Sequence, residues 1–384
     1  MEDKLLFDKI IDRAKTGSVK WDIYSGRDVI PMWVADMDFA SPAVVRDALA
    51  NRIGHGVFGY TWATDQFYEA VVDWVQYRHG WAIKSEWIVP MPGLVSALNV
   101  MCRAFAERGE QVITFTPVYH PFLEAPANMN RTLVRCPLKR VDENFTFDID
   151  LFESMITEET KVLLLCSPHN PVGRVWGDDE LEAVAEVCLK NNIVICSDEI
   201  HCDLILDGFT HTPTASISSD ISQNTITLMA PSKTFNVPGL GCAFAIIENK
   251  TLRDKFKQAA NGIVPYPNAL GYTACQAAFN NGRDWHKQLI SYLTENSKIV
   301  YDTIDSIAGL WCDRVEATYL AWINIEALKL ENGHKYFEEA GVGLSDGNEF
   351  GDGRFLRLNF GCPRELLIEG LNRIKTAVER LYTL

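Results

Sequence analysis

The chain has 384 residues, of which 47% are hydrophobic and 23% are charged, and this composition excludes a disordered or fibrous protein. Its formal net charge of −15 at pH 7 makes nucleic acids and anionic membrane surfaces unfavourable partners. No apolar run approaches the ~18 residues that span a bilayer, so we expect a water-soluble protein and no membrane segment.

The N-terminal segment is charged and helical in pattern, without the apolar core of a secretory signal, so a cytoplasmic protein is expected. Ser41 and Pro42 are predicted to be the N-cap and the first residue of a helix that runs to about Ile53. The residues before them form a separate arm. Ten cysteines are scattered without a Cys-x-x-Cys pair, mostly in apolar runs, which is typical of reduced core residues.

From about residue 86 to residue 247, short apolar runs alternate with amphipathic stretches. This alternation predicts an α/β fold with a mostly parallel central sheet and helices on both of its faces. A helix with an acidic first turn is predicted at Asp178–Asn191. The predicted strands are Trp87–Val89, Gln111–Phe115, Thr132–Arg135, Val162–Cys166, Ile193–Ser197, Thr225–Met229 and Cys242–Ile246.

Beyond this sheet the pattern changes, and helical periodicity dominates Asn268–Ile307. A smaller α+β domain is predicted after it, with its own core packed closely against the first unit. Small-molecule chemistry is expected in a cleft between the two units. The predicted elements of the smaller domain are a strand at Leu320–Ile325, a helix near His334–Ala340, a strand at Phe355–Asn359 and a final helix at Arg364–Leu381.

Lys233 is the single charged residue of the stretch Ala230–Gly241, which follows a predicted strand. Apolar and small neighbours remove water from its ammonium group and so lower its pKa. The neutral amine that forms Schiff bases then becomes available. The alternative is an ordinary solvated lysine at the surface.

Two polar residues follow buried strands, at the sheet edge where open α/β sheets bind ligands. Asp198 comes directly after the strand Ile193–Ser197, and a buried carboxylate there requires a cationic partner. Asn170 lies between Pro168 and Pro171, in a rigid loop that holds its amide group still. The alternatives are a helix-cap or turn aspartate and a tight Asn-Pro turn.

Two further features favour anions. Gly93, Leu94 and Val95 open a helix just after the first predicted strand, so the free N–H groups of the helix N-terminus face the same edge of the sheet. Arg357 lies on a predicted strand, on the face opposite its two neighbouring leucines, and its guanidinium suits bidentate binding of a carboxylate. The alternatives are an ordinary turn glycine and an exposed strand arginine.

Strings of residues spread along the chain carry a family resemblance. The strings are Val34–Phe39, His55–Tyr60, Pro117–Tyr119, SPHNPVG from Ser167, SDEIH from Ser197, PSKTFN from Pro231, Ala317–Trp322 and RLNFGCPR from Arg357. With them the chain resembles the fold-type I pyridoxal 5'-phosphate (PLP) enzymes and, within them, the aminotransferase-like C–S lyases of the MalY/PatB group of cystathionine β-lyases. The resemblance covers nearly the whole chain.

The resemblance implies the PLP-dependent transferase fold, which is also called aspartate aminotransferase-like. Residues 1–45 would be an N-terminal arm that is part of the small domain. Residues 46–285 would be the large PLP-binding domain, and residues 286–384 the small C-terminal domain.

The resemblance also implies roles around the cofactor ring. Lys233 would bind PLP covalently and then act as the base that removes the substrate α-proton. Asp198 would pair with the pyridinium nitrogen and keep the ring protonated. Asn170 would hydrogen-bond the 3-oxygen of the ring, and Tyr119 would stack on the ring face.

Further implied roles concern the phosphate, the substrate and a second subunit. The amides of residues 93–95, together with Ser232, would hold the phosphate, and Arg357 would bind the substrate α-carboxylate. Tyr60 would reach the phosphate of the other subunit, which implies a homodimer with shared active sites.

The position eight residues after the lysine favours one reaction over another. Many aminotransferases of this fold carry an arginine there for the phosphate, whereas this chain has Gly241, as the lyase subgroup does. The expected reaction is α,β-elimination on a small-molecule amino acid with sulfur on Cβ, giving pyruvate, ammonia and a thiol. Cystathionine, cysteine and related S-substituted cysteines remain open as substrates, and an aminotransferase of the same fold is the alternative.

Other classes of function have weaker signals. Ser345 lies in a G-x-S-x-G string, but a glycine-rich stretch rather than a helix follows it, so a serine hydrolase is a remote alternative. A binding protein without turnover is disfavoured because the residues implied in catalysis are all present. The eight histidines are dispersed and predict no metal site; His120, His169 and His201 are expected to line the pocket or to form buried hydrogen bonds.

Overall fold

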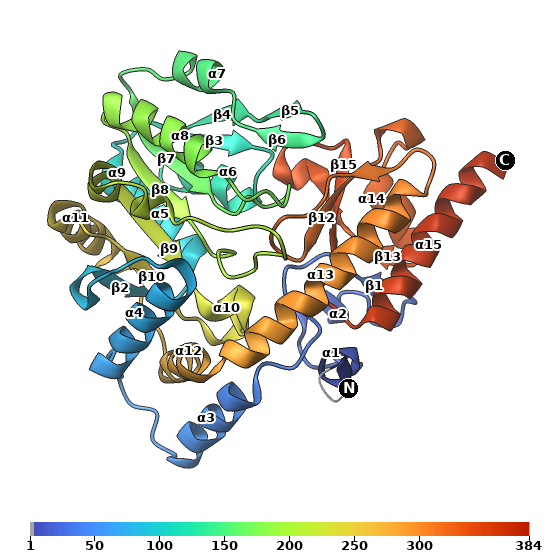
Figure 1. Ribbon diagram of the computed structural model, residues 1–384, viewed down its shortest axis with the longest axis horizontal. Coiled ribbons are helices and arrows are strands. Elements are labelled where there is room, and N and C mark those ends of the chain that lie inside the picture. Colours follow the sequence, from blue (N-terminus) through green and yellow to red (C-terminus); the bar gives the residue numbers. More distant parts are fainter. Residues whose placement is uncertain (1–3, 384) are drawn as a thin grey trace.

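The computed structural model describes residues 4–383 and contains a seven-stranded central sheet with the order β2-β10-β9-β8-β7-β3-β4 (Figure 1). The two pairings that involve β10 are antiparallel, and the other four are parallel. The predicted mostly parallel sheet is therefore confirmed. The first and last residues of each predicted strand lie within two residues of those observed. The strands are β2 (Ile88–Met91), β3 (Gln111–Thr116), β4 (Thr132–Pro137), β7 (Thr160–Cys166), β8 (Val194–Asp198), β9 (Thr225–Met229) and β10 (Ala243–Ile246).

Both faces of this sheet are buried, as the apolar runs predict. Alternate residues of β7 show this, because side chains along a strand point to opposite faces. Val162 and Leu164 pack in the same core as residues of α5, α6 and α11. Leu163 and Leu165 pack in another core with residues of α7 and α8.

The second unit is built on a four-stranded antiparallel sheet of order β11-β12-β15-β14. The predicted strands and helices of this unit are confirmed to within two residues. The division at residues 45 and 285 stays a prediction, and the second boundary lies in the first turn of α13. The remaining strands are β1 (Ile30–Pro31), which pairs with β13 (Val342–Gly343), the hairpin β5 (Lys139–Val141) and β6 (Asn144–Thr146), β11 (Trp311–Cys312), β12 (Leu320–Asn324), β14 (Ser345–Asp346) and β15 (Phe355–Asn359).

Helices cover both sheets (Figure 1). The predicted helical stretch around residues 268–307 is two helices, α12 and α13, which are interrupted at Gly282. The helices are α1 (Lys4–Asp8), α2 (Val19–Asp22), α3 (Ala43–Gly54), α4 (Asp65–His79), α5 (Leu94–Phe105), α6 (His120–Asn128), α7 (Ile149–Ser154), α8 (Asp178–Lys190), α9 (Ser219–Asn224), α10 (Pro231–Thr234), α11 (Lys250–Ala260), α12 (Ala269–Asn281), α13 (Arg283–Asp305), α14 (Gly333–Glu339) and α15 (Arg364–Thr383).

The prediction that Ser41 is the N-cap of α3 is wrong. Pro42 is the N-cap residue, and no side chain caps this helix. The Ser41 hydroxyl instead donates a hydrogen bond of 2.9 Å to the backbone carbonyl oxygen of Asn236. Ser41 thus joins the N-terminal arm to the loop after Lys233, a long-range contact that a local capping pattern cannot indicate.

Two further expectations concern cysteines and membrane segments. All ten cysteines are buried and free of disulfide bonds, as their apolar surroundings predict. Among residues 4–383, no helix has the length and apolar character needed to cross a bilayer.

A buried cluster of charges anchors the N-terminal arm. Lys20, which is fully buried, donates to a carboxylate oxygen of Asp38 at 2.7 Å, and Trp21 donates to the other oxygen at 2.8 Å. Arg13 forms ion pairs of 2.7 Å with both Asp36 and Asp38. Burial alone raises the pKa of Asp38, but these cationic and polar partners outweigh burial and hold the pKa below its usual value.

The Lys20–Asp38 pair yields a stability prediction. Replacing Lys20 with methionine leaves Asp38 buried with only part of its compensation, and we expect the free energy of unfolding to fall by about 3 kcal/mol. Urea denaturation measures the change. The exposed residue Lys287 offers the control Lys287→Met, for which a change within about 0.5 kcal/mol is expected. A loss below about 1 kcal/mol in Lys20→Met would show that the pair does not anchor the arm.

Candidate active site

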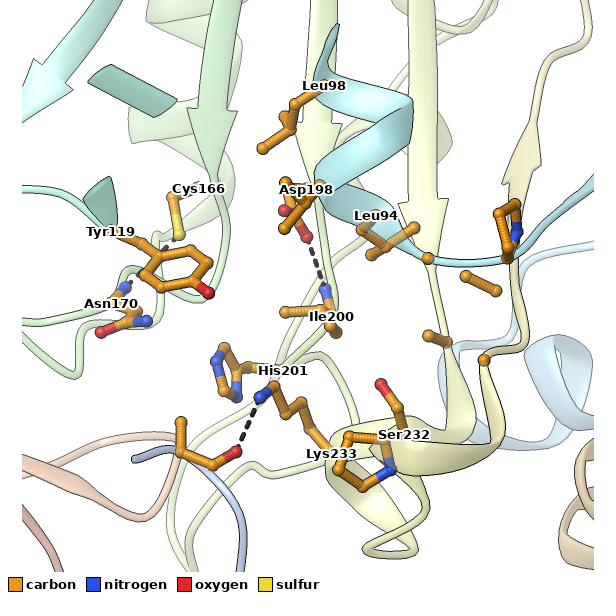
Figure 2. Close-up of a pocket in the computed structure, with 18 of the residues that line it drawn as sticks. Leu94, Leu98, Tyr119, Cys166, Asn170, Asp198, Ile200, His201, Ser232 and Lys233 are labelled. Carbon is orange, nitrogen blue, oxygen red and sulfur yellow. Dashed lines mark hydrogen bonds between the residues drawn. The ribbon is translucent and has the colours of Figure 1, made fainter. Parts of the chain in front are cut away.

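A pocket lies at the carboxyl ends of β7, β8 and β9, where Figure 2 shows Tyr119, Asn170, Asp198, His201 and Lys233 around one space. Its volume is about 170 Å³. An apolar cavity of about 150 Å³ is large enough to bind benzene, so the pocket has room for one six-membered aromatic ring. A pocket therefore lies at the edge of the central sheet where the sequence predicts ligand binding.

Lys233 lies in the short helix α10, and its side chain enters the pocket (Figure 2). Its amine donates a hydrogen bond of 2.6 Å to the backbone carbonyl oxygen of Ala35. Burial, followed by the positive charge of Arg357, lowers the pKa of Lys233 to about 8. The interpretation as a solvated surface lysine is wrong, and the amine is suited to nucleophilic chemistry near neutral pH.

Asp198 ends β8 and is buried at the wall of the pocket. Its carboxylate accepts a hydrogen bond of 3.1 Å from the backbone N–H of Ile200, so it does form a turn, as the alternative interpretation states. Within residues 4–383, however, no ion pair neutralises this carboxylate. Burial consequently raises the pKa of Asp198 to about 7. A cationic group inside the pocket would provide the missing partner.

Arg357 does not line this pocket, but it contacts the lining residue Asn170. A guanidinium N–H of Arg357 donates to the side-chain oxygen of Asn170 at 3.0 Å. A second nitrogen donates to the carbonyl oxygen of Trp33 at 3.0 Å and to the hydroxyl of Ser345 at 3.2 Å. The alternative of an exposed strand arginine is wrong, because Arg357 is buried. Burial lowers the pKa of Arg357 to about 10, which still leaves the group cationic at neutral pH.

The predicted anion site also lines the pocket. Gly93 is the N-cap of α5, and Gly93, Leu94, Val95 and Ser232 all border the cavity. The first N–H groups of a helix have no partner within the helix and favour an anion. Gly241 lies beside them with a φ of +60°, a left-handed conformation that a residue with a side chain rarely adopts.

Tyr119 and His201 line the pocket, and His169 is buried close to it. Tyr119 lines the pocket, and its backbone N–H donates to the carbonyl oxygen of Asn170 at 3.1 Å. His201 is buried at the pocket wall, and burial lowers its pKa well below the usual value. His169 is buried with its Nε2 atom 2.7 Å from the carbonyl oxygen of Pro117, and burial lowers its pKa to about 4. His120 lies beside Tyr119 with a ring separation of 4.7 Å and does not border the cavity.

Tyr60 and Ser345 also do not line this pocket. Tyr60 lies between α3 and α4 and is fully exposed. Ser345 lies on β14, where its hydroxyl donates to the carbonyl oxygen of Trp33 and accepts from Arg357. A short 3-10 helix follows Ser345, so the strand–turn–helix arrangement of a hydrolase nucleophile is absent at this residue.

One group of possible metal ligands was not indicated by the sequence. His79, Cys202 and Asp203 have ligand atoms within 4.8 Å of one another. The Asp203 carboxylate already accepts from the indole N–H of Trp74 at 2.9 Å and from Arg78 at 3.3 Å. These donors compensate the burial of the Asp203 carboxylate, so its burial does not require a metal ion.

The backbone carbonyls of Trp33 and Ala35 were missed by sequence reasoning. Each accepts a hydrogen bond from a charged side chain of the site, Arg357 and Lys233 respectively. A carbonyl oxygen is present at every residue, so no residue type marks one that binds a functional group. The string Val34–Phe39 carried the family resemblance but no chemical signal.

The sequence matches a known protein family. The model of the family described as "Aminotransferase class I and II" matches residues 27–374. The chain belongs to this family. Within it, the chain is 38% identical to the cystathionine beta-lyase PatB of Bacillus subtilis, over 97% of this chain and 99% of PatB. It is 33% identical to the protein MalY of Escherichia coli, over 97% of this chain and 98% of MalY.

A solved structure of the family gives the same fold. The crystal structure of cystalysin from Treponema denticola, which contains a pyridoxal 5'-phosphate cofactor, matches with a TM-score of 0.93 and 37% identity. The match covers 98% of this chain and 99% of cystalysin. The resemblance to the MalY/PatB group and the predicted fold class are confirmed.

The electrostatics of the pocket make a measurable prediction. Because burial and Arg357 disfavour the ammonium form, the Lys233 amine should lose its proton with a midpoint near pH 8. Trace acylation of the ligand-free protein at a series of pH values, followed by peptide mass spectrometry, measures this midpoint. Arg357→Leu removes a neighbouring positive charge and should raise the midpoint pH of Lys233 deprotonation. A midpoint near pH ~10.4, the ordinary value for lysine, would contradict the assignment.

Proposed function

We propose that this protein is a PLP-dependent C–S β-lyase that acts on amino acids with sulfur on Cβ. The supporting observation is one pocket that holds an amine of lowered pKa, Lys233, and a buried carboxylate without a cationic partner, Asp198. The name of PatB as a cystathionine beta-lyase supports cystathionine as a substrate. Cleavage then yields pyruvate, ammonia and the thiol homocysteine.

The pocket has room for the ring of PLP, and the residues around it suit the chemistry of PLP. Asp198 would provide the anion for a protonated ring nitrogen, and Lys233 the amine for the covalent bond. Tyr119 and Asn170 would orient the ring. The amides of residues 93–95, with Ser232, would hold the phosphate. When bound, PLP supplies an electron sink for the negative charge that develops on the substrate α-carbon.

The remaining roles belong to the chain itself. Arg357 binds the substrate α-carboxylate, and its bonds to Asn170, Trp33 and Ser345 keep the guanidinium in one orientation. A substrate held in this way presents its α-proton to Lys233, which removes it as a base. Orientation of the bond to be broken selects the reaction, and the thiolate leaves from Cβ.

Gly241 supports elimination over transamination. An arginine at this position would be strained by the φ of +60°, a conformation that L side chains rarely adopt. The phosphate therefore depends on the start of α5 and on hydroxyl donors for its neutralisation.

We also propose a homodimer in which Tyr60 reaches the phosphate of the other subunit. The stretch of residues 55–64 exposes Val57, Phe58, Tyr60 and Trp62. The exposed Tyr266 lies 5.9 Å from Trp62, ring centre to ring centre. Apolar groups gathered on one surface in this way are typical of an interface. A cytoplasmic location is in keeping with the ten reduced cysteines.

Pyruvate release tests the reaction. The purified protein with PLP should absorb in the visible range and release pyruvate from cystathionine without any oxo-acid acceptor. Lys233→Ala should lose the visible absorption and reduce the rate by at least about 10³-fold, because both the covalent bond and the base are removed. A panel with cysteine and other S-substituted cysteines compares substrates in the same assay.

Matched variants separate the alternatives. Arg357→Lys keeps the charge but loses the bidentate geometry, and it should raise KM with the visible absorption retained. If amino-group transfer to an oxo acid is faster than pyruvate release, the protein is an aminotransferase instead. A colourless wild type after addition of PLP would exclude the cofactor.

Subunit complementation tests the shared site. Lys233→Ala and Tyr60→Ala, each inactive alone, should recover about a quarter of the wild-type activity when mixed, unfolded and refolded together. The reason is that half of the random dimers are mixed, and each mixed dimer has one intact site. Sedimentation measures the dimer directly. No recovery from a mixture that sediments as a dimer would show that Tyr60 acts within its own subunit or not at all.

A further inference from the structure

One stretch of the N-terminal arm, residues 33–39, contacts Lys233 in the pocket and Arg357 beside it. The carbonyl oxygen of Trp33 accepts from Arg357 at 3.0 Å, and that of Ala35 accepts from Lys233 at 2.6 Å. We call residues 33–39 the positioning segment. Its backbone therefore links the proposed substrate-binding group to the proposed base.

Asn236 fastens this segment to the loop that carries Lys233. Its side-chain oxygen accepts from the backbone N–H of Met37 at 2.9 Å. Its side-chain nitrogen donates to the carbonyl oxygens of Met37 at 2.7 Å and of Phe39 at 2.8 Å. One amide group thus makes three hydrogen bonds to the segment, from a position three residues after the lysine.

The backbone of Asn236 explains why this residue type is present. Its φ is +54°, in the left-handed region, which asparagine tolerates better than most residues. An amide also offers a donor and an acceptor on one short side chain, which the alternating N–H and C=O groups of the segment require. Glycine would keep the conformation and lose the bonds, while aspartate would keep the shape and lose the donors.

Other contacts hold the segment near Lys233. The phenol of Tyr319, which is buried, donates to the same carbonyl of Ala35 at 2.8 Å. The side-chain amide of Asn359 donates to the carbonyl of Asp36 at 2.7 Å. Tyr319 thus holds the Ala35 oxygen itself and Asn359 holds the next residue, so Lys233 meets an acceptor at a defined place.

We propose that Asn236 is a positioning residue that places the Ala35 carbonyl to hold the Lys233 amine whenever that amine is not bound to the cofactor. A lysine side chain has four rotatable bonds, so an amine without an acceptor is spread over many conformations. The carbonyl keeps the amine at one place, from which it removes the proton. This inference rests on the proposed role of Lys233 as the cofactor-binding lysine and base.

Two variants of Asn236 and one control test the proposal in the holoenzyme. Asn236→Gly should reduce kcat by about 10- to 100-fold, the cost of misplacing a catalytic group by about 1 Å, and change KM by less than about 3-fold. Asn236→Asp is isosteric but turns an oxygen toward two carbonyls, so kcat should fall at least as far. Asn192, which is exposed and has a φ of +56°, provides the control Asn192→Gly, for which wild-type kinetics are expected.

Hydrogen exchange of the peptide that spans residues 33–39 is a second readout, which does not depend on activity. In Asn236→Gly the Met37 amide loses its acceptor, and its exchange should accelerate by about 10-fold or more. Exchange in β7 and β8 should stay at the wild-type rate. Wild-type kcat together with wild-type exchange in Asn236→Gly would overturn the proposal. A rise in KM with an unchanged kcat would overturn it as well.

A third variant keeps the proposal testable if the Asn236 variants do not fold. Tyr319→Phe removes the phenol that shares the Ala35 carbonyl while keeping the buried ring, and it should also lower kcat more than it changes KM. An unchanged kcat would overturn the proposal. A wild type without visible absorption or pyruvate release would instead overturn the proposed function, so the two failures are distinguishable.

Discussion

Loss of water from three charged side chains is the constraint on which this site depends. Lys233 and Asp198 lie at one edge of the central sheet, and Arg357 of the smaller sheet contacts Asn170 at the same edge. Burial is the first cause of the shifted pKa in each of the three. Burial makes the amine easier to deprotonate and the carboxylate harder to ionise. A pocket in this state favours a ligand that is cationic near Asp198 and anionic near Arg357 and α5.

The fold creates this environment by joining two sheets and an arm. Lys233 and Asp198 come from the central sheet and the turn after it, whereas Arg357 comes from the smaller antiparallel sheet. Residues 33–39 lie between these contributions and bind Arg357 and Lys233 through backbone carbonyls. A buried ion cluster around Asp38 anchors the same stretch, so the ionic interactions of the arm and the geometry of the pocket are coupled.

Sequence reasoning succeeded where a residue type has a local consequence. The continuous apolar runs of β7 and β8 indicated strands buried on both faces, and the polar residues just after them indicated the edge that binds ligands. It failed at Ser41, because the Ser41 hydroxyl bonds to the backbone of Asn236 and does not cap α3 as its local pattern predicts. It also treated Ser345 as a possible nucleophile. The hydroxyl of Ser345 instead bonds to Trp33 and Arg357, which the local sequence around Ser345 cannot reveal.

The sequence alone determined the α/β class, the strands of the central sheet and the family, because periodicity and local strings of residues carry that information. Tertiary structure decided three contacts: the pairing of Arg357 with Asn170, the hydrogen bond from Lys233 to Ala35, and the hydrogen bonds of Asn236 to Met37 and Phe39. Each of these contacts joins residues that are more than 180 positions apart, with separations of 187, 198 and up to 199. Two of them depend on backbone atoms that every residue possesses, so only the folded chain selects which ones meet.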